Sequence, residues 1–415
     1  MESSPLKKLL TNTPLVITGM GAFSAGGDSV SQLWQAAVAG QSLAQLAKFQ
    51  AEELEEYFSV CRAPELAATR PELHSVRKMD RCVQMALLAA QQAVEQANLR
   101  AAFPPERIGV MVGSSRGPFS RRNEAPAGFK AGRYPPTLSA NSTFAALSGA
   151  LAQSFKFKGP GATIAATCAS SAFAIGLAAE QILLGKVDAM LVGGTEAPLH
   201  HPILAQLAAA GVLGNHPDPR LTCRPFDVTR NGLVLGEGSA FLVLEPAALA
   251  DKRGAKPLAR LSGWSFSLDN AGRTTVAEDG AGLYSAMKQA LVLADLGADK
   301  IDYINAHGTG TKMNDAAEAA AVRQLFGARA AQLPCSSTKP VTGHALGATA
   351  ALEAVISIAA LQQQIIPPTA NCTAPDPLCA IQMQPLSAQA ATLNHVMSNS
   401  LGFWGYHAAL IFSRA

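Results

Sequence analysis

The sequence contains little charge and no long run of charge of one sign. Of its 415 residues 15% are charged, and 33 Lys and Arg nearly balance 30 Asp and Glu, which leaves a net charge of +3. Proteins that bind nucleic acids carry clustered basic residues, so this composition excludes an obvious nucleic-acid-binding class. A local basic patch that faces an acidic protein partner remains compatible with it.

The sequence also lacks a signal peptide and an uninterrupted membrane span. The first residues, MESSPLKKLLTNTP, have no apolar core of the kind that directs export. The two longest apolar stretches, 161–185 and 347–368, are each interrupted by Glu and by small polar residues, which favours buried helices over membrane spans. We therefore expect a cytoplasmic protein with no membrane insertion.

Paired cysteines and nucleotide-binding fingerprints are absent too. The seven cysteines are an odd number and form no C-x-x-C pair, which argues against a disulfide framework and against a zinc site. The glycine-rich segments VGSSRGP and VGGTEAP match neither a dinucleotide fingerprint nor a P-loop. We expect most of the cysteines to be small buried hydrophobic residues and one to be reactive.

The sequence does contain short β-rich runs, most of which end in glycine, alternating with alanine-rich helical stretches. This alternation predicts an α/β architecture with mixed or parallel sheets. One strand leads through Cys168 into a small-residue helix, and a later segment leads past His344 into another. We infer two similar halves joined near residues 252–260. The predicted helices cover 82–98, 169–184, 282–296, 315–326 and 346–363.

Cys168 lies in GATIAATCASSAFAIG, where a strand gives way to a helix. In the first turn of a helix the dipole favours a thiolate, and the free N–H groups there can hold an oxyanion. A buried structural cysteine is the alternative. The flanking Ala, Thr and Ser residues leave space around the sulfur, which favours a nucleophile.

His307, in YINAHGTGTKMND, and His344, in TKPVTGHALGATAALE, each follow a strand among Gly and Thr residues. Either histidine alone would suit a structural hydrogen bond. Together with Cys168 they indicate nucleophilic acyl chemistry in which His is the proton or oxyanion partner. Lys339 and Glu353 flank His344 in sequence and would fix the imidazole, unless they are solvated surface charges.

A metal site is the competing interpretation for these histidines. Neither has a second His, Cys or carboxylate at the usual ligand spacing, and the adjacent His200 and His201 would point apart. We therefore predict that no metal is bound.

In combination, these motifs resemble the elongating β-ketoacyl-acyl-carrier-protein synthases of the thiolase-like superfamily. Two active-site histidines point to the elongating class, because the chain-initiating class has one histidine and an asparagine. Retention of Cys168 argues against the inactive chain-length-factor subunits. The likeness covers almost the whole chain, through TCASSAFAIG, RPFDVTRNGLVLGEGSAFLVLE, NAHGTGTKMND, SSTKPVTGHALGATAALEA and NSLGFWGYHAALIF.

The resemblance implies a thiolase-like five-layered αβαβα fold of two related halves. Residues 1–255 would form the half that carries the nucleophilic cysteine, and residues 256–415 the half that carries the two histidines. It also implies a homodimer, although a heterodimer with another ketosynthase-like subunit is open. Acyl-carrier protein is the implied partner, and its basic docking patch would include Arg77 and Lys78. Further candidates for this patch, or plain solvated charges, are Arg121, Arg122 and Lys130.

The implied reaction is a decarboxylative Claisen condensation by an acyltransferase. Cys168 would accept an acyl group from phosphopantetheine, and its own N–H with that of Phe403 would form the oxyanion hole. His307 and His344 would polarise the malonyl thioester, so that loss of CO2 leaves an enolate that attacks the acyl group. Lys339 and Glu353 would orient the histidines. No metal or bound organic cofactor is needed.

The sequence departs from the family pattern at two places. Where relatives read Gly-Phe-Gly-Gly-Thr-Asn, this chain has GFWGYH, so that Trp404, Tyr406 and His407 replace smaller residues beside the gate residue Phe403. In the family this loop moves with the lid at 268–280. Arg116 lies where long-chain enzymes carry a small or aliphatic acyl-pocket residue, and a buried guanidinium there needs a partner.

These departures favour a specialised ketosynthase over housekeeping fatty-acid elongation. We expect it to act in a polyketide, aryl-polyene or unusual fatty-acid pathway on a short, unsaturated or aromatic acyl chain. A degradative thiolase would need a second catalytic cysteine near the C-terminus, where SNSLGFWGYH has none. A non-catalytic partner subunit is the remaining alternative, and the retained cysteine, lysine and histidines argue against it.

Overall fold

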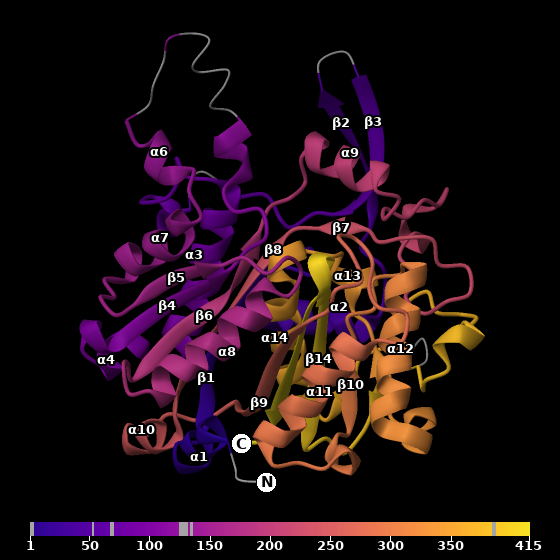
Figure 1. Cartoon of the computed structure of the whole chain (residues 1–415). Coiled ribbons are helices and arrows are strands. Elements are labelled where there is room, and N and C mark those ends of the chain that lie inside the picture. Colours follow the sequence, from indigo (N-terminus) through magenta and orange to yellow (C-terminus); the bar gives the residue numbers. More distant parts are fainter. Residues whose placement is uncertain (1–3, 52–53, 67–69, 124–131, 133–135, 384–386) are drawn as a thin grey trace.

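A computed structural model of the chain describes residues 4–51, 54–66, 70–123, 132, 136–383 and 387–415. Its centre is a mixed sheet of ten strands (Figure 1). In spatial order the strands are β11 (Cys335–Ser336), β10 (Tyr303–Asn305), β14 (His395–Gly402), β15 (Tyr406–Ser413), β9 (Ala259–Leu268), β1 (Leu15–Ser24), β8 (Gly238–Pro246), β6 (Ala189–Glu196), β4 (Ile108–Gly113) and β5 (Gly161–Ile164).

The sheet consists of two halves with the same pairing pattern. From β5 to β1 the strands pair parallel, parallel, antiparallel and antiparallel, and from β11 to β9 the same sequence of pairings recurs. The halves meet where β1 pairs antiparallel with β9, in a register that places Leu15 opposite Leu261. The predicted boundary at residue 255 falls between α10 (Ala247–Lys252) and β9. That division stays a prediction, which the repeated strand order supports.

Helices and sheet halves alternate in layers. Helices α3 (Arg81–Gln96) and α7 (Ala145–Phe155) cover the outer face of the first half. Helices α11 (Ala281–Ala294) and α12 (Lys312–Phe326) form the outer layer of the second half. Between the halves lie α8 (Ser170–Leu183) and α14 (Thr349–Gln363), and both contact strands of each half. The α/β class and the order of layers agree with the fold predicted from the sequence.

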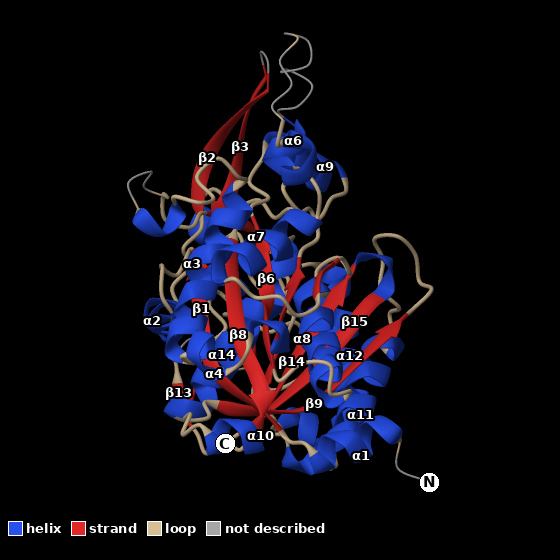
Figure 2. Ribbon diagram, turned by 90° about the vertical axis from the view of Figure 1, so that its left-hand side faces the viewer, coloured by secondary structure: helices blue, strands red, loops and turns tan. Residues whose placement is uncertain are grey.

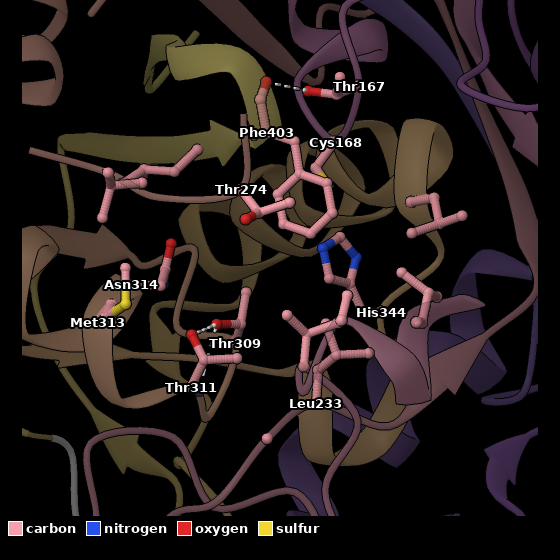
Figure 3. A pocket seen from close by; sticks show the side chains of 18 of the residues that line it. Thr167, Cys168, Leu233, Thr274, Thr309, Thr311, Met313, Asn314, His344 and Phe403 are labelled. Atoms are coloured by element: carbon pink, nitrogen blue, oxygen red, sulfur yellow. Dashed lines mark hydrogen bonds between the residues drawn. The ribbon is translucent and has the colours of Figure 1, made fainter. Parts of the chain in front are cut away.

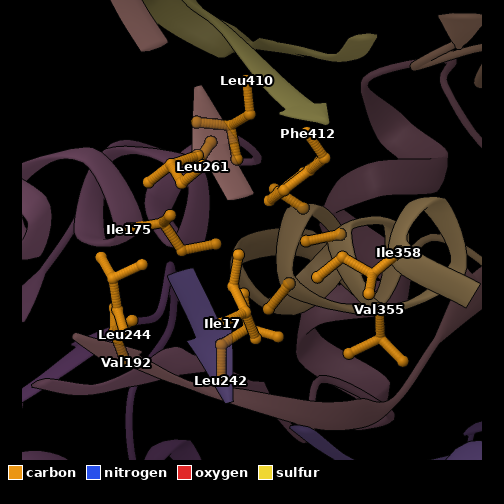
Figure 4. Close-up of a cluster of buried hydrophobic side chains, with 14 of the residues drawn as sticks. Ile17, Ile175, Val192, Leu242, Leu244, Leu261, Val355, Ile358, Leu410 and Phe412 are labelled. Atoms are coloured by element: carbon orange, nitrogen blue, oxygen red, sulfur yellow. The ribbon is translucent and has the colours of Figure 1, made fainter. Parts of the chain in front are cut away.

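The central helices are buried because their surfaces are built from small and aliphatic residues. The stretch from Leu346 to Gln363 is long and apolar enough to cross a membrane, yet 89% of it is buried inside the protein. This agrees with the predicted buried helix. Figure 4 shows the packing between the layers, where Ile17 of β1, Ile175 of α8, Ile358 of α14 and Phe412 of β15 meet.

The five predicted helices correspond to α3, α8, α11, α12 and α14. The prediction missed a hairpin of β2 (Gln45–Ala51) and β3 (Leu54–Cys61), which pairs with β7 (Leu235–Gly236) and projects beyond the main sheet (Figure 2). It also missed β9, whose first residues fall in the segment 252–260 where the two halves were predicted to join. The remaining elements are α1 (Pro5–Asn12), α2 (Val30–Ala39), α4 (Leu99–Ala102), α6 (Leu138–Asn141), α9 (His201–Ala209), α13 (Lys339–Thr342), β12 (Ile365–Ile366) and β13 (Gln389–Ala390).

Two glycines of β1 allow α3 to lie directly on the sheet. A Cβ on Gly19 would lie 2.1 Å from the carbonyl oxygen of Ala93, and one on Gly21 would lie 2.0 Å from that of Ala89. Both distances are far below van der Waals contact. The glycines therefore fix how closely the helix approaches the strand.

We predict that Gly21→Ala lowers the free energy of unfolding by about 2 kcal/mol or more, because the added methyl group meets backbone that cannot move aside. The matched control is Gly149→Ala in the exposed part of α7, where no atom lies within 4 Å of the added Cβ. There the change should be neutral or stabilising by up to about 1 kcal/mol. Chemical denaturation of the two variants measures both values, and equal stabilities would refute this account of the packing.

Candidate active site

Cys168 lies in the turn between β5 and α8, two residues before the helix begins. Thr167 has a φ of 49°, a left-handed conformation that is unusual for a β-branched residue. Its hydroxyl donates to the carbonyl oxygen of Phe403 at 3.2 Å (Figure 3). A Cβ on Gly402 would lie 2.0 Å from the Thr167 hydroxyl and 3.1 Å from the Cys168 amide nitrogen. The loop that carries Phe403 is therefore in direct contact with the turn that presents the thiol.

The structure brings Cys168, His307 and His344 together. One donor atom of each lies within 4.8 Å of the others, and the two imidazole rings meet edge to face with centroids 5.3 Å apart. All three line a cavity of about 670 Å³. In Figure 3 the Phe403 ring lies beside Cys168 and close to His344. Of the seven cysteines, Cys168 is the one that reaches this cavity among the residues the structure describes.

A buried lysine fixes His307. The ammonium of Lys339 donates to Glu353 Oε1 at 2.6 Å, to His307 Nδ1 at 3.2 Å and to the carbonyl oxygen of His307. These three bonds use all the N–H groups of the ammonium. Because Nδ1 of His307 accepts a bond, the ring proton resides on Nε2. Burial, with the Lys339 charge as a second cause, holds the pKa of His307 well below its usual value.

His344 is fixed by a hydrogen bond from its backbone N–H and by a contact of its ring with the first residue of α14. Its N–H donates to the carbonyl oxygen of Val234 at 2.8 Å, and its Nδ1 lies 3.0 Å from the hydroxyl of Thr349. Burial, and then the charge of Lys339, lowers the pKa of His344 well below its usual value. Both histidines are therefore neutral near pH 7. A neutral imidazole keeps one N–H group, which can donate a hydrogen bond to a carbonyl oxygen.

The thiol of Cys168 is protonated at rest. Burial raises its pKa to about 12, and the positive charges of Lys339 and Arg116 act in the opposite direction. These two cations are thus the groups that stabilise the thiolate when it forms. The predicted helix-dipole contribution has the same sign, since α8 begins two residues later.

Acidic residues that the sequence prediction passed over fix the loop of His307. Glu318 of α12 accepts hydrogen bonds from the backbone N–H groups of His307 and Gly308, at 2.9 and 2.8 Å. Asp315, one turn earlier, accepts from those of Thr309 and Gly310. Both carboxylates are buried. Their presence in the predicted helix that directly follows the His307 motif was a signal that could have identified them.

Two groups of residues have the chemistry to hold an ion. Cys168, His307 and His344 form a soft donor set, but the ammonium of Lys339 lies against His307 and the thiol keeps its proton, and both features oppose a metal cation. Several other buried oxygen atoms have no partner among the described residues, and such oxygens suit water or a hard cation. They include Asn305 Oδ1, Glu353 Oε2, Ser398 Oγ and Asn399 Oδ1.

The aromatic residues of the GFWGYH loop point in different directions. Trp404 is 58% exposed at the cavity mouth, and the Arg273 guanidinium lies 5.6 Å from its ring centroid. Tyr406 instead turns into the protein, where it meets the edge of Phe173 at 5.7 Å, and Phe173 stacks on Phe266. Tyr406 therefore packs between the layers and does not line the cavity.

His407 is buried and joins the loop to the predicted lid. Its Nε2 lies 2.8 Å from Asp269 Oδ2, and Asp269 donates its backbone N–H to the carbonyl oxygen of Gly405. The imidazole fits because Gly282 has no side chain, since a Cβ there would lie 2.4 Å from the ring. Residues 274–276 of the lid line the cavity. The gate loop and the lid are thus in contact.

Of the remaining predicted residues, one lines the cavity and the others that the structure describes lie elsewhere. Arg116 lines the cavity, whereas Arg77 and Lys78 are exposed on the segment before α3. The Arg122 guanidinium lies over the rings of Phe119 and Phe144, and Lys130 lies outside the described residues. The adjacent His200 and His201 contact different partners, Ser120 and Glu56, as expected for side chains that point apart.

Comparisons with known proteins agree with this geometry. The N-terminal domain model of the beta-ketoacyl synthases matches residues 12–250, and the C-terminal domain model matches residues 258–373. A 3-oxoacyl-[acyl-carrier-protein] synthase 2 of Staphylococcus aureus is 35% identical over 97% of this chain and 99% of its own length.

Two solved structures share the fold at a TM-score of 0.88 each. One is a type II polyketide acyl-carrier protein in complex with its ketosynthase bound to the hexaketide, 27% identical over 97% of this chain and all of that chain. The other is the ishigamide ketosynthase/chain length factor, 31% identical over 97% of this chain and 99% of that chain.

We predict that Lys339→Met lowers the free energy of unfolding by about 3–5 kcal/mol at pH 8, because the Glu353 carboxylate is left buried without a cation. Burial already raises the pKa of Glu353 to about 7. A carboxyl group whose pKa is raised in the folded state makes the folded protein less stable as the pH rises. The stability is lost between the pKa of the group in the unfolded chain, about 4.3, and its raised pKa in the folded protein. The cost of Lys339→Met should therefore be smaller at pH 5.

Chemical denaturation of the wild type, Lys339→Met, Glu353→Gln and the double variant measures this coupling. The double variant should recover part of the lost stability, since the amide introduced by Glu353→Gln carries no charge to bury. Additive losses at both pH values would contradict a buried ion pair.

Proposed function

Because the chain belongs to the beta-ketoacyl synthase family, we propose that Cys168, His307 and His344 carry out its carrier-protein-dependent condensation. The enzyme is an acyltransferase that joins an acyl group to malonyl-acyl-carrier protein and yields β-ketoacyl-acyl-carrier protein. The observation that carries the assignment is the convergence of one thiol and two neutral imidazoles within 4.8 Å in one cavity.

In the first half-reaction the Cys168 sulfur attacks the acyl thioester on phosphopantetheine. The carbonyl oxygen becomes an oxyanion, which the N–H groups of Cys168 and Phe403 stabilise. The pantetheine thiol leaves with the proton that Cys168 gives up, and the acyl group remains on the cysteine as a thioester. Lys339 and Arg116 supply the positive charge that favours the attacking thiolate.

In the second half-reaction the malonyl thioester occupies the emptied cavity. His307 donates its Nε2–H to the thioester carbonyl oxygen, and His344 donates beside it. The carbon–carbon bond to the carboxylate breaks, CO2 leaves, and the electron pair becomes an enolate that the two N–H groups hold. The enolate carbon attacks the acyl-cysteine, whose sulfur leaves as a thiolate and takes up a proton from solvent water. Loss of CO2 drives the reaction, so no metal or organic cofactor is required.

Carrier protein is the partner that the site requires, and one relative is a ketosynthase in complex with its acyl-carrier protein. Arg77 and Lys78 are exposed and basic, which suits an acidic carrier. For the oligomer we propose a homodimer, because β5 ends the strand order with one edge open to a second copy. A heterodimer with a chain-length-factor-like subunit is the second candidate, as one relative is a ketosynthase/chain length factor.

Arg116 in the cavity wall and the altered gate loop favour a specialised pathway over housekeeping elongation. A guanidinium beside the nucleophile is a poor neighbour for a long saturated chain. The cavity wall also contains apolar residues, with Leu207, Leu233 and Leu346 among them.

We predict that Cys168→Ala abolishes acyl loading, while His307→Ala and His344→Ala still load but lose CO2 release by about a hundredfold or more. Intact-protein mass spectrometry measures loading from acyl-carrier protein, and a CO2-release assay with malonyl-carrier protein measures the second step. Acylation of Cys168→Ala at the wild-type level would refute the nucleophile. Full CO2 release by both histidine variants would refute their role.

We also predict that, among saturated, unsaturated and aromatic acyl-carrier proteins, the wild type loads short, unsaturated or aromatic chains faster than long saturated ones. The rate of mass gain on the intact enzyme gives the order directly. Preferential loading of long saturated chains would show a housekeeping elongation enzyme instead.

A further inference from the structure

Arg116 is placed beside the nucleophile by a rigid turn. The turn follows β4, and the backbone N–H groups of Ser115 and Arg116 donate to the two oxygens of Glu196 at 2.7 and 2.9 Å. Glu196 also accepts from the hydroxyl of Ser114 and the N–H of Gly347. These four bonds fix the backbone of Arg116, so its side chain enters the cavity from a stationary point.

The guanidinium of Arg116 has no counter-charge in the part of the chain that the structure describes. Its Nε is buried without a hydrogen-bond partner, and no ion pair of Arg116 occurs among those residues. Glu196, which holds its backbone, already receives four hydrogen bonds. Leu207 and Leu346, which line the same cavity as Arg116, belong to an apolar cluster.

A guanidinium in this situation calls for an anionic ligand. Leaving a charge partly buried and unpaired is costly, whereas a carboxylate takes two parallel N–H bonds from the same planar group. A neutral hydroxyl or keto group would accept one bond and leave the charge uncompensated. An aromatic ring would stack on the guanidinium and leave Nε unpaired.

We propose that Arg116 binds a carboxylate at the far end of the acyl group, so that the enzyme takes half-thioesters of dicarboxylic acids. The inference rests on the proposed function, because it requires the acyl group to be held on Cys168. Arg116 and Cys168 line the same cavity, so one acyl chain can reach from the thioester to the guanidinium. Arg116 is then a residue that determines specificity, and the apolar walls contact the methylene groups between the two ends.

The test compares acyl-carrier proteins that differ only at the end of the chain. Chains of four, six and eight carbons end in a carboxylate, a methyl group or a hydroxyl group, and intact-protein mass spectrometry follows the loading rate of the wild-type enzyme. At the best chain length the carboxylate-ended chain should load at least about tenfold faster than the other two, because a site built for a charged hydrogen-bond partner rejects analogues without it.

Arg116→Met should reverse this ratio in favour of the methyl-ended chain, and Arg116→Lys should keep part of the preference for the carboxylate. Arg220→Met is the matched control, since its guanidinium is paired with Asp218, whereas the Arg122 guanidinium donates to the carbonyl oxygen of Arg116. All substrates share one carrier, so a docking defect in this variant slows them equally and leaves the ratio unchanged.

The proposal is overturned if the wild type loads the three kinds of chain at equal rates, or the hydroxyl-ended chain as fast as the carboxylate-ended one. It is also overturned if Arg116→Met keeps the wild-type ratio and loses thermal stability, which would assign the guanidinium to a protein carboxylate. In each case loading of Cys168 by any chain leaves the proposed function standing. Failure of every chain to load, with no CO2 release from malonyl-carrier protein, would refute the proposed function itself.

Discussion

The burial of one ammonium group, that of Lys339, is the constraint on which the site depends. A charge placed this deep is stable only if each N–H finds an acceptor, and Glu353 and His307 supply all three. The same contacts set the proton on Nε2 of His307, and the Lys339 charge adds to burial, the larger cause, in lowering the pKa of both histidines. The charge also offsets part of the burial that disfavours the Cys168 thiolate. Three chemical properties of the cavity thus follow from one ion pair.

The layered fold explains how this charge can be held. Glu353 belongs to α14 and Cys168 precedes α8, and these two helices form the central layer. His307 and Lys339 follow the short strands β10 and β11 in the second half of the sheet. The active site therefore lies where the ends of both halves meet the central helices. Because the central layer is buried, the Glu353 carboxylate is not solvated by water and stays paired with the Lys339 ammonium.

The alternation of strands and helices could be predicted from the sequence, and the structure brings the predicted Cys168, His307 and His344 to one cavity, whereas Glu318 and Asp315 were passed over. Ala, Thr and Ser around Cys168, and Gly and Thr around His307 and His344, distinguish these positions from core residues. The sequence did not predict the directions in which the gate-loop side chains point. Tyr406 turns inward because Phe173 and Phe266 offer a ring to meet, and Trp404 turns outward at a φ of 63°. These side-chain directions depend on contacts with residues far away in the chain, and local sequence patterns do not predict such contacts.

The same contacts couple the gate loop to the lid. The backbone N–H of Trp404 donates to the carbonyl oxygen of Arg273, and His407 contacts Asp269, which also accepts from two amides of its own loop. Phe403 directly precedes these two attachments, and its own carbonyl oxygen accepts a hydrogen bond from Thr167. A displacement of Phe403 away from the thiol therefore strains the bond to Thr167 and the adjacent bond from Trp404 to the lid. Because His407 is nearly sealed from water and its carboxylate partner is held by two amides, the gate loop and the lid are joined by a buried contact as well as by the Trp404 bond.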